Sequence, residues 1–143
     1  MKNSFQMTKL KCFYVCLFFL GIGIQQSYSQ TYKFRTSGFS VLEKNERGKW
    51  GKWSDLSLVN ITVTLDTDKN RILVYSQNIQ LYEIQTYQPE SESESDLVYS
   101  FLCRDIDGID CTLSIITRKK QDNRKQLYIS YPDHVIVYNI FTM

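Results

Sequence analysis

Residues 97–115 read LVYSFLCRDIDGIDCTLSI, and this stretch decides the fold. On both sides of its centre, apolar and polar side chains alternate along the chain. Alternation with a period of two is typical of a β-strand that buries one face. The centre, DIDG at 105–108, is rich in residues that favour tight turns. The stretch therefore predicts an antiparallel β-hairpin.

The apolar pattern also predicts the register of this hairpin. A two-residue loop would place every apolar side chain opposite a polar one. A three-residue loop at 106–108 instead places Leu113 opposite Phe101 and Cys111 opposite Cys103. Its glycine then falls where this kind of turn needs a left-handed backbone. Because a slip of one residue would turn the apolar side chains to the wrong face, we expect the three-residue loop.

Most other segments between residues 30 and 143 also show strand character, and none shows a 3.6-residue apolar period. The clearest is VNITVTLD at 59–66, which alternates without error. Short connections with turn-forming residues separate the segments. The pattern predicts an all-β fold of about eight antiparallel strands in a meander, closed as a small lipocalin-like barrel, with a β-sandwich as the alternative. The expected strands are 32–43, 59–66, 71–76, 79–87, 97–103, 109–115, 127–131 and 134–141.

The first 29 residues have the order of a secretory signal peptide. Three lysines precede an apolar run of 13 residues at 12–24, and small polar residues follow it. The alternative is a membrane anchor, but a span needs ~20 apolar residues. We expect cleavage after Ser29, a single domain at 30–143, a secreted or periplasmic location and no transmembrane span after cleavage. Without those lysines, 14 basic residues face 15 acidic ones, and the formal charge falls from +2 to −1. Nothing in this charge favours nucleic acid.

Export and hairpin register together suggest a disulfide between Cys103 and Cys111. Two of the four cysteines lie in the predicted signal, so the exported domain keeps only this pair. Directly opposed residues have Cα atoms ~4.5–5.5 Å apart, within the range a disulfide accepts. The alternative is two reduced thiols that act as small apolar side chains.

The hexapeptide GKWGKW at 48–53 holds both tryptophans of the chain. Trp and basic residues are common anchors of binding sites, so we consider Trp50, Trp53, Lys49 and Lys52 as candidate ligand-binding residues. The alternative is that one indole packs into the core or rim of the barrel. Gly51 would permit a bulge that turns both indoles to one face.

Two loops of opposite charge form a second candidate surface. In a meander the connections at 88–96 and 118–125 flank one hairpin, so both emerge at the same end of the barrel. These loops are expected to be solvated, to attract each other, or to bind a partner. The candidate partner-binding residues are Glu90, Glu92, Glu94, Arg118, Lys119 and Lys120.

Residues for catalysis or metal binding are sparse. The only histidine, His134, lies in a predicted turn, which does not favour a Ser-His-Asp triad or a zinc site. Aspartate-rich turns at 66–70 and 105–110 resemble fragments of calcium loops but lack the full ligand pattern. We expect no enzymatic activity, no metal site and no cofactor.

The segments QTYKF at 30–34 and VYN at 137–139 open and close the predicted domain. With the signal peptide, they resemble short secreted proteins of unknown function from Bacteroidota. This resemblance rests on structural motifs and implies no activity or catalytic residue.

Together these features predict a non-enzymatic exported barrel that binds a small apolar ligand or a glycan at its mouth. The alternative is a protein-interaction or enzyme-inhibitor module that uses its charged loops on an envelope protein. An empty cavity above ~300 Å³ would favour a ligand, and a filled interior with an exposed aromatic patch would favour a protein partner.

Overall fold

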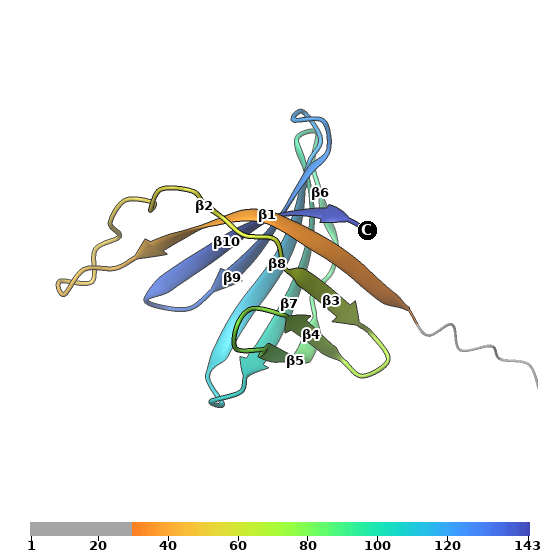
Figure 1. Ribbon diagram of the computed structural model, residues 1–143, viewed down its shortest axis with the longest axis horizontal. Coiled ribbons are helices and arrows are strands. Elements are labelled where there is room, and N and C mark those ends of the chain that lie inside the picture. Colours follow the sequence, from red (N-terminus) through yellow and green to blue (C-terminus); the bar gives the residue numbers. More distant parts are fainter. Residues whose placement is uncertain (1–29) are drawn as a thin grey trace, which may run out of the picture.

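A computed structural model describes residues 30–143 of the chain, and these residues form strands and turns without a helix (Figure 1). The predicted signal peptide at 1–29 lies outside the described residues. Eight strands of four to thirteen residues carry the fold. They are β1 (Thr31–Glu43), β3 (Thr62–Asp66), β4 (Arg71–Val74), β5 (Gln80–Tyr87), β7 (Asp96–Asp105), β8 (Asp110–Arg118), β9 (Arg124–Ser130) and β10 (His134–Thr142).

These eight strands form a closed antiparallel barrel. Each pairs with its neighbour along the chain, and β1 also pairs with β10, which closes the sheet. The predicted meander and barrel are confirmed, and a single closed sheet excludes the β-sandwich. Two short strands were not expected: β2 (Ser57–Leu58) pairs with β1, and β6 (Ser91–Glu92) pairs with β7.

The β7–β8 hairpin has the predicted register. Cys103 pairs with Cys111 and Phe101 with Leu113. The Asp105 amide donates to the Ile109 carbonyl at 2.9 Å across the loop, and Gly108 has a φ of +77°. The three-residue loop is therefore confirmed, with its glycine in the left-handed conformation.

Inward-facing side chains fill the barrel. Val74, Leu113, Leu127 and Ile129 are all 0% exposed, and they come from three different strands, β4, β8 and β9. Along β8 the residues 111, 113, 115 and 117 are buried, while those between them are partly exposed. An eight-stranded barrel is just wide enough for such a core. The interior is thus a packed core, and a ligand has to bind at an end or on the outside.

The first strand contains a β-bulge that shapes one side of the barrel. Its register with β10 shifts between Thr36 and Gly38, so Ser37 is the extra residue. The buried Thr36 hydroxyl donates to the Val59 carbonyl at 2.8 Å and accepts from the Ile61 amide at 3.0 Å. Because these bonds replace a regular ladder, the strand expected from residue 59 begins at Thr62 instead.

Past the bulge, residues 50–58 run back along β1, and we call them the return segment. The Gly51 amide donates to Glu43 and the Ser54 amide to Val41, both at 2.8 Å. A Cβ on Gly38 would lie 3.0 Å from the Ser57 carbonyl oxygen, so a glycine lets the two backbones approach. In Figure 1 the loop that joins β1 to this segment projects beyond the barrel.

The antiparallel order places successive connections at alternate ends of the barrel. One end, the pocket end, holds the connections at 44–56, 75–79, 106–109 and 131–133. The other, the terminal end, holds the start of β1, the end of β10 and the connections at 67–70, 88–95 and 119–123.

The expected disulfide is absent: Cys103 and Cys111 are both buried free thiols. Asp105 and Ile109 form a hydrogen-bonded pair at the start of the hairpin. Because hydrogen-bonded and non-hydrogen-bonded pairs alternate along antiparallel strands, residues 103 and 111 also form a hydrogen-bonded pair. The Cβ atoms of such pairs lie at the wide end of ~4.5–5.5 Å, whereas a disulfide needs ~3.8 Å. The Cα range on which the disulfide was predicted covers both kinds of pair and so does not distinguish them. The Cys103 thiol instead donates to the Phe101 carbonyl at 3.6 Å.

Both thiols are expected to resist a thiol-specific reagent in the folded protein. Burial raises the pKa of Cys103 to about 12 and that of Cys111 to about 11, so neither forms the reactive thiolate at neutral pH. A colorimetric thiol assay should detect two slow thiols at pH 8 that react at once in denaturant. Absence of both thiols after unfolding would contradict the structure.

Candidate functional site

An open pocket of about 860 Å³ lies at the pocket end of the barrel. Three connections line it, those between β4 and β5, β7 and β8, and β9 and β10. We call it the mouth pocket. Its size is within the range of small-molecule sites.

The rim of the mouth pocket is apolar. Ile79, Ile106 and Ile109 line it and are 59%, 74% and 50% exposed. Turns usually carry polar residues, so three exposed isoleucines at one end are unusual. Hydrogen bonds to a side chain stabilise the β7–β8 turn: one carboxylate oxygen of Asp105 accepts hydrogen bonds from the amides of Asp107 and Ile109 at 3.0 and 2.9 Å. The rim is therefore presented by an ordered turn.

The floor of the pocket is polar and hydrogen-bonded. The Tyr131 hydroxyl donates to the second oxygen of Asp105 at 2.7 Å, and the Tyr82 hydroxyl donates to Gln80 at 2.6 Å. Burial raises the pKa of Tyr82 and of Tyr131, so both hydroxyls stay protonated donors. The hydrogen bond from Tyr131 lowers the pKa of Asp105, which stays a carboxylate.

One side of the pocket carries a stacked pair. The rings of Tyr131 and His134 are 4.5 Å apart with an angle of 12° between their planes. His134 Nδ1 lies 2.7 Å from a carboxylate oxygen of Asp133, and this contact lowers the pKa of that carboxyl. An apolar rim over a few fixed polar groups is the usual composition of a binding site.

Replacing Asp105 with asparagine is expected to flatten the acid side of the stability profile. A carboxyl with a lowered pKa stabilises the fold above its unfolded pKa of about 3.9, and this contribution is lost as pH falls through the folded pKa. Urea unfolding from pH 6 to pH 2 should show a smaller decrease for Asp105→Asn than for wild type. Asp68→Asn, an exposed site at the terminal end, is the control, and an equal decrease in all three proteins would refute the role of Asp105.

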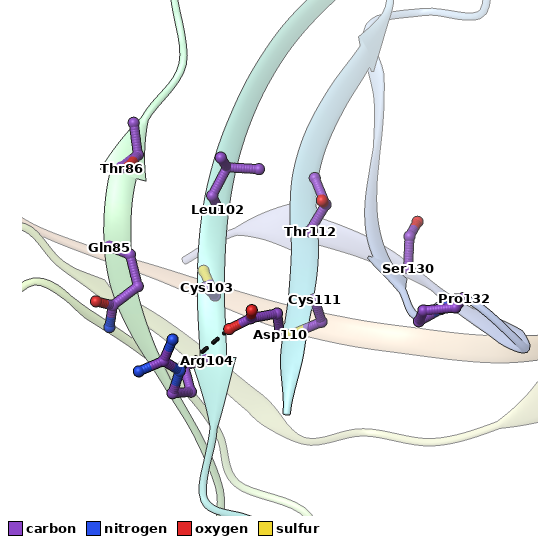
Figure 2. Close-up of a pocket in the computed structure, with 10 residues that line it drawn as sticks. All are labelled: Gln85, Thr86, Leu102, Cys103, Arg104, Asp110, Cys111, Thr112, Ser130 and Pro132. Atoms are coloured by element: carbon purple, nitrogen blue, oxygen red, sulfur yellow. Dashed lines mark hydrogen bonds and ion pairs between the residues drawn. The ribbon is translucent and has the colours of Figure 1, made fainter. Parts of the chain in front are cut away.

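A second hollow, of about 480 Å³, lies on the outside of the barrel (Figure 2). Its outward-pointing residues include Leu102, Thr112 and Ser130, and the dashed line marks the ion pair of Arg104 with Asp110 at 3.1 Å. Both members of that pair are largely exposed. This outer groove mixes the apolar Leu102 and Pro132 with polar and charged side chains and is smaller than the mouth pocket, so it is the weaker candidate for a ligand.

The predicted tryptophan site lies beside the mouth pocket and does not line it. Trp50 and Trp53 are both 47% exposed, so neither is a core residue. The ammonium of Lys44 lies over the Trp50 ring at 4.9 Å, and the Lys44 amide donates to the Asp133 carbonyl at 2.9 Å. Lys49 is exposed, and Lys52 borders a separate hollow of about 410 Å³.

The two charged loops lie together at the terminal end, as predicted. The Lys119 ammonium contacts the Glu92 carboxylate and donates to the Ser93 carbonyl at 2.9 Å, and Arg118 pairs with Asp96 at 3.0 Å. Tyr99 donates to Glu90 at 3.3 Å. Glu94 and Lys120 are exposed. Much of this charge is therefore used within the chain.

Metal ligands and membrane-spanning helices were both sought within residues 30–143. No group of three or more His, Cys, Asp or Glu side chains is placed to hold a metal ion there. No helix in this part of the chain is long and apolar enough to cross a membrane. In the aspartate-rich turn at 66–70, Asp66 accepts the Lys69 amide at 3.1 Å.

Fold and site define a small closed antiparallel β-barrel with a packed interior and an open pocket at one end. No family model, curated protein or solved structure matches the chain. The resemblance to secreted Bacteroidota proteins stays a prediction.

The sequence predicts a ligand at the mouth of the barrel but not the residues that line the mouth pocket. Asp105 and His134 were expected in turns and Tyr131 at the end of a strand, and the sequence does not show that the three meet. The available signal was the set of isoleucines at 79, 106 and 109, since a meander brings these connections to one end.

Proposed function

We propose that the protein is a non-enzymatic binding protein that holds a small apolar ligand in the mouth pocket. The observation that carries this proposal is the open volume of about 860 Å³ behind three exposed isoleucines. An apolar rim favours an apolar ligand over a glycan, which needs many polar contacts. With residues 1–29 as a signal peptide, the place of action would be the periplasm or the outside of the cell.

A neutral apolar fluorophore tests the proposal. N-phenyl-1-naphthylamine should bind with a saturable rise in fluorescence. The double variant Ile79→Ser/Ile106→Ser should bind at least about tenfold more weakly, because full burial of one aliphatic side chain contributes ~1.5 kcal/mol or more and a ligand at an open rim buries each isoleucine only in part. Leu58→Ser removes an even more exposed apolar residue from the return segment and should bind like wild type.

Two results would refute the ligand proposal. One is the absence of saturable binding by the wild-type protein. The other is an equal loss of binding in Leu58→Ser and in the isoleucine double variant, which would indicate general surface adsorption.

The exposed apolar residues of the return segment favour a second candidate, a protein partner. Trp50, Trp53, Leu56 and Leu58 are 47%, 47%, 56% and 86% exposed, and β2, which contains Leu58, pairs only with β1. Contiguous exposed apolar residues mark interaction surfaces, and an open edge can accept a strand. Capture of one defined envelope protein by wild type, but not by Trp50→Ala/Trp53→Ala, would support this candidate. Equal capture by the tryptophan variant would contradict it.

A further inference from the structure

Carboxylates outnumber basic side chains around the mouth pocket. Asp105, Asp107 and Asp133 line it, and no lysine or arginine does so among the described residues. His134 is the basic side chain among the lining residues, and it contacts Asp133. Lys44 does not line the pocket and places its ammonium over the Trp50 ring; the contact with His134 and, to a lesser extent, the charge of Lys44 lower the pKa of Asp133. A concave, partly apolar site lined mainly by one sign of charge attracts a ligand of the opposite sign.

The carboxylates are interleaved with the apolar rim. Asp105 and Asp107 flank Ile106 in the same turn, and Asp133 approaches from the β9–β10 connection. A ligand that packs against Ile106 therefore has carboxylates on both sides of its apolar part. Asp107 makes no side-chain hydrogen bond or ion pair within residues 30–143 and is exposed. Its charge is open to a ligand.

The other two carboxylates are held in place. Asp105 accepts three hydrogen bonds, from two amides of its own turn and from Tyr131. Asp133 is held by His134. Because these oxygens are fixed before a ligand arrives, binding requires little reorganisation of the site.

We infer that the mouth pocket selects ligands in which a cationic group, such as a protonated amine, adjoins an aliphatic or aromatic part. This inference rests on the proposed function and adds the ligand class. A fatty carboxylate of the same length would bring a fourth negative charge to the site, and a neutral alcohol would gain no charge interaction.

Three ligands of equal chain length test the inference by isothermal titration calorimetry at pH 7 and low salt. They are 1-octylamine, 1-octanol and octanoate, each kept below the concentration at which it aggregates. Octylamine should bind about tenfold more tightly than octanol, and octanoate more weakly than octanol. Salt at about 0.5 M should remove most of the advantage of the amine.

Matched variants test whether the carboxylates of the mouth pocket cause the preference for the amine. Asp107→Asn/Asp133→Asn should lower the affinity for octylamine about tenfold and leave that for octanol unchanged. Asp68→Asn, at the terminal end, should change neither. Equal affinities for octylamine and octanol, or tightest binding of octanoate, would overturn the charge preference while the apolar site stands. No binding of any of the three, with no binding of the neutral fluorophore, would overturn the inference and the proposed function together.

Discussion

Replacing Leu127 with alanine is expected to lower the free energy of unfolding by about 3–5 kcal/mol. Leu127 is 0% exposed on β9, in the middle of the packed interior. The cost of such a substitution is lost apolar burial plus the cavity left behind, and it is largest where neighbours cannot collapse. Here a closed ring of hydrogen-bonded strands holds the neighbours apart. Urea unfolding at pH 7 measures the change.

Leu58→Ala is the matched control for this prediction. Leu58 is 86% exposed on β2, so its truncation should change the free energy of unfolding by less than about 0.5 kcal/mol. A decrease below about 1 kcal/mol for Leu127→Ala would mean that the interior is not packed as described.

Replacing Thr36 with valine is expected to cost about 2–4 kcal/mol, although the two side chains have nearly the same shape. The hydroxyl bonds both Val59 and Ile61, and Thr36 is 1% exposed. Valine would leave a carbonyl and an amide without partners, and each buried polar group left unpaired costs about 1–3 kcal/mol. The Ile61 amide should also lose protection in hydrogen exchange.

Thr36→Ser distinguishes the hydroxyl from the volume. Serine keeps both hydrogen bonds but loses a methyl group, which costs about 1 kcal/mol. If the hydroxyl acts by anchoring residues 59–61, the serine variant should be the more stable of the two. The reverse order would show that Thr36 acts by filling space.

The β7–β8 hairpin could be predicted to the residue because two independent features agree. Alternation, of which the two cysteines are part, and a glycine at the left-handed position require the same pairing. The state of the cysteines could not be predicted in the same way. It depends on whether the pair is hydrogen-bonded, which moves the Cβ atoms by about an ångström without changing which residues are opposed.

Neither the return segment nor the residues of the mouth pocket could be predicted from a period-two pattern. The bulge at Ser37 breaks the alternation of β1, and residues 50–58 pair with it through irregular hydrogen bonds. The pocket residues come from three separate connections, so their proximity depends on how the meander closes. In the sequence alone, only the apolar residues in those turns were informative.

Closure of the barrel also bears on the order of folding. Every strand pair among the eight is local in the chain except β1 with β10, whose residues are about 100 positions apart. Contacts distant in sequence form late, because the entropy of ring closure has to be offset by structure already in place. The β1–β10 seam is thus expected to form last in folding and to part first in unfolding, with the β7–β8 hairpin as an early nucleus.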